Sequence, residues 1–199
     1  MSNGRQGARR SRVIAARHQS VEGQGLIEGQ SVVAFYEGTG TDDRGRSLDD
    51  ILRFDDAKLE YVHDFIQWIF PLPERSGANP SAPILDQRAI DAFRTRPELR
   101  AALRRSLDRM LAFYGFEWNR ERIVKSAAFP QRSRNWLSRE NHNHLRITRI
   151  LRSLYVLGEM QAARALFDAL LAIYDETARS DRGRISERSF EFWKRAIEL

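Results

Sequence analysis

Apolar residues recur every three or four positions through most of the chain after residue 47, which is the period of amphipathic α-helices. An alternating apolar and polar pattern, typical of strands, is almost absent. The periodicity predicts helices over residues 48–54, 56–70, 87–114, 142–157, 159–180 and 186–199. The predicted fold class is therefore all-α, a single-domain helical bundle or orthogonal array of about six to seven helices.

Local signals place the ends of these helices. Four side chains that favour helix N-caps stand directly before a predicted helix: Ser47, Asp55, Asp86 and Asn141. Ser47 followed by Asp50 resembles a capping box. Pro71 and Pro73 end the second helix, because proline lacks an N–H and restrains the residue before it. Gly115 can adopt the left-handed conformation that ends the third.

The remaining segments show no sustained period. Residues 1–32 are rich in Gly, Ser, Gln and Arg, and we predict a flexible, disordered basic tail. Residues 31–38 are expected to form a short extended arm, residues 38–47 a glycine-rich loop and residues 116–140 an irregular connection. The predicted organisation is a tail over 1–32 and one helical domain over 33–199.

Composition narrows the class of protein. The 199 residues suffice for one domain with a real core, and 42% are hydrophobic while 30% are charged, as in a soluble globular protein. The absence of cysteine excludes disulfides, thiolate metal sites and thiol nucleophiles, and favours a cytoplasmic location. No secretory signal and no transmembrane stretch is expected.

Positive charge is concentrated in two places. The net charge is +6, and residues 120–152 carry eight Arg and Lys125 against two Glu, while residues 1–30 carry five Arg against two Glu. Within the central segment Trp136 lies among the arginines Arg132, Arg134 and Arg139. Such a mixture can stack bases and neutralise phosphates, which makes nucleic-acid binding an alternative function. An exposed arginine-rich loop would give the same pattern.

Two polar stripes interrupt otherwise apolar helices. On the helix predicted for 56–70, Glu60, Asp64 and Gln67 form a narrow stripe with His63 at its border. On the helix predicted for 142–157 a second stripe contains His142, Arg146, Arg149 and Ser153.

Two interpretations of the stripes stay open: a satisfied network of buried polar groups, or a site for an anionic ligand at a helix end. We expect the stripes to face each other, with Asp64 and Glu60 paired to Arg146 and Arg149.

Long stretches of the chain resemble the conserved region of the opioid growth factor receptor family. They read FYEG at 35–38, EYVHDFIQWIFPLPE at 60–74, MLAFYG at 110–115 and HNHLRITRILRSLYVLG at 142–158. The resemblance covers roughly residues 33–160. It implies binding of an enkephalin-type peptide by a non-membrane, nucleus-associated receptor, an activity of the animal members. The chain looks like a short member of prokaryotic composition, without the long tail and repeats of the animal receptors.

The resemblance also implies site residues. The positions that match its two main motifs and carry polar or aromatic side chains form the predicted ligand-binding set: His63, Asp64, Gln67, Trp68, His142, Asn143, Arg146 and Arg149. His144 stands where the animal receptor has Asn, so it is not counted on for chemistry.

No catalytic constellation is evident. The sequence contains no HExxH zinc motif, no glycine-rich phosphate loop before a helix and no GxSxG nucleophile elbow. His142 and His144 are two positions apart on a helix, so they face nearly opposite ways and do not easily share a metal. We therefore expect a non-enzymatic protein without metal or cofactor.

Three classes of function remain. The preferred one is a domain that binds a peptide or a small anionic ligand. The alternatives are nucleic-acid binding through residues 120–152 and a structural protein-interaction module that uses the last helix. The sequence leaves the natural ligand and the oligomeric state open.

Overall fold

Helices dominate the fold. The computed structural model describes residues 31–77, 79–178 and 185–198. Residues 31–37 are helical, and the elements that follow are α2 (Leu48–Leu52), α3 (Asp56–Tyr61), α4 (Ile66–Ile69), α5 (Gln87–Thr95), α6 (Pro97–Tyr114), β1 (Phe116–Asn119), β2 (Arg122–Lys125), α7 (Phe129–Arg132), a 3-10 turn (Ser133–Asn135), α8 (His142–Val156), α9 (Met160–Ala178) and α10 (Glu187–Ala196). Residues 1–30 of the predicted tail lie outside the described residues, while its last two residues, 31 and 32, belong to a helix and are not part of a disordered tail.

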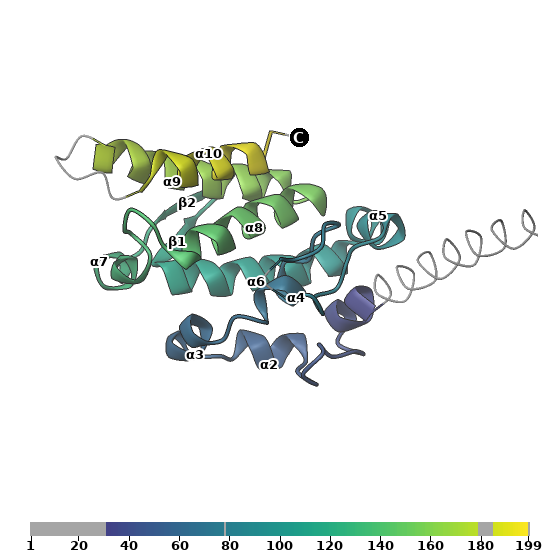
Figure 1. The fold of residues 1–199 in the computed structure, drawn as a ribbon. Coiled ribbons are helices and arrows are strands. Elements are labelled where there is room, and N and C mark those ends of the chain that lie inside the picture. Colours follow the sequence, from purple (N-terminus) through teal and green to yellow (C-terminus); the bar gives the residue numbers. More distant parts are fainter. Residues whose placement is uncertain (1–30, 78, 179–184, 199) are drawn as a thin grey trace, which may run out of the picture.

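The long helix α6 crosses the middle of the molecule (Figure 1). Helices α8, α9 and α10 lie on one side of α6 and pack on one another, while α2 and α3 lie on the other. The hairpin of β1 and β2 sits near one end of α6, where β1 contacts α6 and β2 contacts α9. The short helix α4 lies beside α6 near the centre of the molecule (Figure 1).

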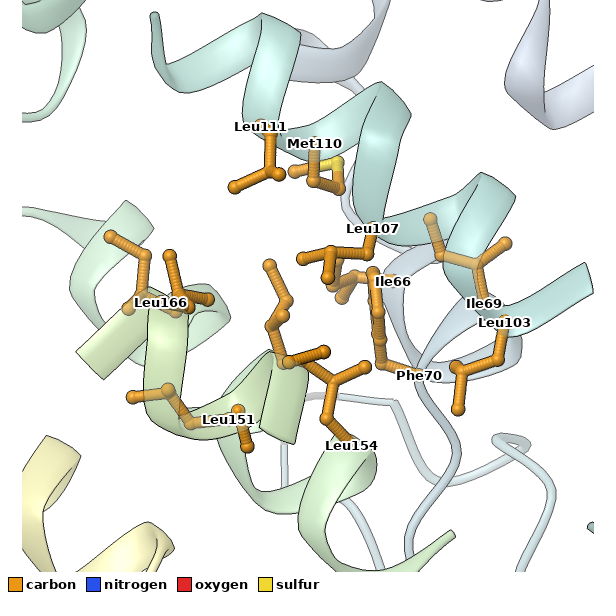
Figure 2. Packing of buried hydrophobic residues seen from close by; sticks show 14 of the residues in the cluster. Ile66, Ile69, Phe70, Leu103, Leu107, Met110, Leu111, Leu151, Leu154 and Leu166 are labelled. Carbon is orange, nitrogen blue, oxygen red and sulfur yellow. The ribbon is translucent and has the colours of Figure 1, made fainter. Parts of the chain in front are cut away.

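The core forms where α4, α6, α8 and α9 meet (Figure 2). Ile66, Ile69 and Phe70 of the α4 region face leucines of α6 and α8, including Leu107 and Leu154. All five side chains are buried. Full burial of an Ile, Leu or Phe side chain is worth about 1.5–3 kcal/mol, so these contacts hold the central segment between the two long helices.

The four predicted N-caps and the C-terminal glycine of α6 are confirmed. Ser47 and Asp50 form a reciprocal capping box at α2. The side chains of Asp55, Asp86 and Asn141 accept hydrogen bonds from backbone N–H groups in the first turns of α3, α5 and α8. Gly115 ends α6 with φ +90°. These signals act within a few residues, which is why the sequence reveals them.

The all-α prediction needs a correction, because residues 116–125 form a hairpin inside the segment predicted to be irregular. Phe116, Trp118 and Ile123 alternate with polar residues, and β1 pairs antiparallel with β2 across a two-residue turn. Arg120 in this turn has φ +56°. The strands have four residues each, which is too short to stand out from the helical period on either side.

Three further element predictions are wrong. The single helix expected over 87–114 is two helices, because Arg96 before Pro97 is extended and separates α5 from α6. The single helix expected over 56–70 is broken, since α3 ends at Tyr61 and α4 has only one turn. The extended arm expected over 31–38 is a helix over 31–37 whose Val32 and Phe35 are fully buried. The described residues therefore contain more helices than the six to seven predicted.

Candidate functional site

Residues 62–72, which we call the strap, cross the core and contain only one helical turn, α4. A helix that ends inside a protein leaves its last carbonyl groups without partners. Arg146 of α8 supplies them: its guanidinium donates to the carbonyls of Leu59 at 2.8 Å and Val62 at 2.9 Å. It also donates to Oδ1 of Asn143 at 3.2 Å. Arg146 is only 5% exposed, so this guanidinium closes the end of α3 from inside the fold.

The far end of the strap is held in the same way. Arg149 donates to the carbonyl of Phe70 at 3.1 Å, and the hydroxyl of Ser153 donates to the carbonyl of Pro71 at 2.9 Å. Positions 146, 149 and 153 lie along one face of α8. Burial lowers the pKa of both the Arg146 and the Arg149 guanidinium. The polar stripe of α8 is thus a row of donors matched to backbone carbonyls.

The predicted ion pairs between the two stripes are wrong, although the two segments do meet. Asp64 accepts from Arg46 at 2.8 Å and lies 3.4 Å from Arg44, both in the loop before α2. Glu60 instead accepts from Nδ2 of Asn143 and lies 3.1 Å from Nε2 of His142. The two carboxylates therefore bind other partners than the two arginines of α8, and the break after Tyr61 removes Asp64 from the helix face assumed for it.

Two other members of the predicted ligand-binding set are buried. With its amide nitrogen toward the backbone, Gln67 donates to the carbonyls of Asp64 and His63 at 3.2 and 3.3 Å. The Trp68 side chain is 5% exposed and its ring lies 5.3 Å from that of Phe35. Neither side chain is accessible to a ligand in this conformation.

His63 and His142 are the exposed members of the set. Their ring centroids are 5.4 Å apart at the surface, where the end of α3 meets the start of α8. Burial lowers the pKa of His142, against the opposing effect of Glu60. Tyr61 beside them is 85% exposed.

The basic segment is partly internal as well. Trp136 is fully buried and its Nε1 donates to the carbonyl of Tyr114 at 2.9 Å, so the base-stacking role predicted for it is wrong. Arg132 donates to the carbonyl of Ala112 and pairs with Asp56. Arg134 and Arg139 are exposed. Without the aromatic ring, the segment retains charge alone as a reason to bind nucleic acid.

His144 connects three parts of the chain. Its Nε2 lies 2.9 Å from the carbonyl of Trp136, which can only accept, so Nε2 carries the proton and Nδ1 accepts from the hydroxyl of Ser189. The indole of Trp193 in α10 donates to the carbonyl of His144 at 3.0 Å. His144 is 3% exposed, and burial lowers its pKa. It is a neutral structural histidine, and no local pattern in the sequence indicates its partners Trp136, Ser189 and Trp193.

This arrangement predicts a loss of stability in mild acid. A lowered pKa means that the unfolded chain binds a proton more readily than the folded chain, so the free energy of unfolding decreases as the pH falls below about 6.5. Urea titrations between pH 7.5 and 5 measure the slope. In His144→Gln the slope should be smaller, since only His142 then contributes a lowered histidine pKa from this region. An unchanged slope in the variant would contradict the assignment.

A groove of about 740 Å³ lies between β2 and α9, away from the strap. Its apolar lining comes from the hairpin and from one side of α9: Phe116, Ile123, Val124, Met160, Ala165, Ala169, Ala172 and Ile173. Met160 is 56% exposed, although it is a large apolar side chain. Apolar grooves of this size with a few polar groups at the rim are typical of ligand sites.

Charged side chains surround this groove. Arg122, Lys125 and Arg164 lie on its rim together with Glu121 and Asp168. Lys125 pairs with Glu176 of α9. The groove could not be predicted from the sequence, because one wall is the hairpin, whose strands are short, and the alanines of α9 resemble ordinary helix positions.

The chain belongs to the opioid growth factor receptor family: the model of the opioid growth factor receptor (OGFr) conserved region matches residues 35–198. Mouse opioid growth factor receptor is 42% identical over 103 residues, which are 50% of this chain and 16% of that protein. Human opioid growth factor receptor is 39% identical over 103 residues, 50% of this chain and 15% of that protein. Mouse opioid growth factor receptor-like protein 1 is 39% identical over 113 residues, 52% of this chain and 22% of that protein.

These matches also set limits. The chain spans less than a quarter of the length of the curated relatives it matches. No solved structure matches it significantly. The prokaryotic source suggested by composition finds no support in these relatives, which are animal proteins. Within the described residues no helix is long and apolar enough to cross a membrane, and no three His, Asp or Glu side chains are grouped as a metal site would need.

Proposed function

We propose that this domain is a non-catalytic receptor domain that binds a peptide in the groove between β2 and α9. The observation that carries the proposal is the groove itself, an open apolar channel of about 740 Å³ with charged side chains on its rim. Peptides bind such channels by placing apolar side chains on the floor while their polar backbone stays at the rim.

The strap is a weaker candidate for the same role. Arg146 and Arg149, which were expected to hold an anion, already donate to carbonyls of the chain. Gln67, Trp68 and Asn143 are buried. A ligand at this place would have to displace hydrogen bonds that hold the core together, so we favour a peptide in the groove over a small anion at the strap.

The names of the relatives agree with a receptor role. The mouse and human relatives are called opioid growth factor receptors, and the family resemblance implies an enkephalin-type peptide as ligand. The absence of an enzymatic activity and a cytoplasmic location remain predictions from the sequence.

The test is a fluorescence anisotropy titration of a labelled enkephalin-type peptide with the whole 199-residue chain. Ala169 lines the groove in the middle of α9, so Ala169→Trp should fill it and weaken binding at least tenfold. Circular dichroism melts would show that the variant remains folded.

The matched control is the same substitution at the exposed end of α9. Ala178→Trp should leave the affinity within twofold, because Ala178 is exposed and does not line the groove. A third variant, His142→Ala, is titrated with the same peptide. Binding that survives Ala169→Trp but is lost in His142→Ala would place the ligand at the surface between α3 and α8 and overturn the proposal.

A further inference from the structure

The hydrogen-bond register of the hairpin leaves one edge of β2 open. Residues paired across antiparallel strands alternate between hydrogen-bonded and non-hydrogen-bonded pairs. Ser126 N–H donates to the carbonyl of Gly115 at 2.9 Å, which makes that pair a bonded one. In the same register Lys125 opposite Phe116, and Ile123 opposite Trp118, are non-bonded pairs. Ile123 and Lys125 therefore direct their N–H and C=O groups away from β1.

These outward groups border the groove. Ile123 and Lys125 both line it, and no hydrogen bond joins their main-chain groups to another residue in the described part of the chain. An exposed strand edge is a template for another extended chain, which pairs with it at about 4.8 Å. The outward N–H and C=O groups of β2 thus favour a peptide backbone over a compact apolar ligand.

The opposite wall leaves room for such a backbone. Ala165, Ala169 and Ala172 recur at helical spacing on the side of α9 that lines the groove. Their methyl groups project little, and the groove between them and β2 measures about 740 Å³. Because α9 also contacts β2 directly, a third strand would lie along the groove beside the open edge of β2, and the small side chains of α9 leave space above it.

The charged side chains on the rim of the groove indicate that the bound peptide carries a carboxylate. Within the described residues neither Arg122 nor Arg164 forms an ion pair, and both line the groove. Lys125 is paired with Glu176, and the two arginines that remain are matched in number by Glu121 and Asp168, although no ion pair joins them within the described residues. A carboxylate of the bound peptide could form an ion pair with Arg122 or Arg164.

We propose that the groove takes an extended peptide as a third strand on β2, paired with the main chain of Ile123 and Lys125, and that an acidic side chain of this peptide meets Arg122 or Arg164. The inference rests on the proposed function and adds the mode of binding and the class of peptide. Its affinity comes from backbone hydrogen bonds and apolar burial, and its selectivity from the carboxylate.

The experiment starts from peptides selected on the whole chain out of a random phage-displayed heptapeptide library, with the Ala169→Trp variant used to discard peptides that bind elsewhere. The best peptide is then resynthesised with one backbone N-methyl group at each position in turn. Strand addition predicts losses of at least tenfold at two positions, two residues apart, whose N–H groups donate to the carbonyls of Ile123 and Lys125, and less than threefold at the position between them.

The ion pair between the peptide carboxylate and Arg122 or Arg164 is tested separately. Replacing the acidic residue of the peptide with its amide should weaken binding about fivefold to the unchanged protein and hardly at all to the double variant Arg122→Gln with Arg164→Gln. Equal losses on both proteins would refute the ion pair. Recovered peptides without an acidic residue would refute it as well.

Failure of the inference is distinct from failure of the proposed function. If Ala169→Trp blocks binding but N-methylation shows no alternation, a peptide occupies the groove and strand addition is wrong. If no peptide from the library binds the unchanged chain more tightly than the Ala169→Trp variant, both strand addition and peptide binding in the groove are refuted.

Discussion

Replacing Gly115 with alanine is expected to lower the free energy of unfolding by about 3–5 kcal/mol. Gly115 ends α6 at φ +90°, where any residue with a Cβ is strained. A methyl group there would also lie 2.8 Å from the backbone Cα of Phe129. A backbone atom cannot move aside as the end of a side chain can, so the turn that leads into β1 would have to shift. Urea denaturation followed by circular dichroism measures the loss.

Gly158 provides the control, since it ends α8 with a similar φ of +92°. The nearest atom to a methyl group at this position is Cγ of Arg94, at 3.3 Å, on a flexible side chain. Gly158→Ala should therefore cost only the strain of the left-handed conformation, about 1–2 kcal/mol. Equal losses in the two variants would mean that the contact with Phe129 has no energetic consequence.

Replacing Arg146 with alanine should cost a similar amount, about 3–5 kcal/mol, for a different reason. The variant leaves the carbonyls of Leu59 and Val62 and the side-chain oxygen of Asn143 without their donor. Each buried group that loses its partner costs about 1–3 kcal/mol. Arg146→Lys should recover little, because an ammonium group lacks the planar fork that reaches two carbonyls at once.

Two comparisons separate this role from an ion pair. Arg149→Ala should be milder, about 1–2 kcal/mol, because Arg149 donates to the single carbonyl of Phe70. In the double variant of Asp64→Ala and Arg146→Ala the losses should add, since Asp64 pairs with Arg46 and not with Arg146. If the double variant loses much less free energy of unfolding than the two single variants lose together, Asp64 and Arg146 do form an ion pair.

The sequence predicted best what depends on neighbouring residues. The caps at Ser47, Asp55 and Asn141 are side-chain bonds to a backbone two or three residues away. The helical period of α6 and α8 was equally clear, because both helices turn one apolar face toward the core.

What failed depends on distant residues. Nothing local ends α3 at Tyr61: the run to Phe70 is apolar on most sides and reads as a buried helix. The break is stabilised by Arg146, more than eighty positions further along the chain. The acidic side chains were consequently placed on a helix face that does not exist. The groove was missed for the related reason that its two walls, β2 and α9, meet only in the folded chain.

The bonds that hold the strap also set an order of events during synthesis. The carbonyl of Leu59, just before the strap, and those of Phe70 and Pro71 within it accept from side chains that lie 87, 79 and 82 positions later in the chain. A ribosome adds roughly 5–20 residues per second, so the apolar strap waits for seconds before α8 exists. Until then Ile66, Ile69 and Phe70 lack one wall of their core. The nascent chain therefore presents an uncovered apolar segment of the kind that chaperones bind, and closes it only when α8 has been made.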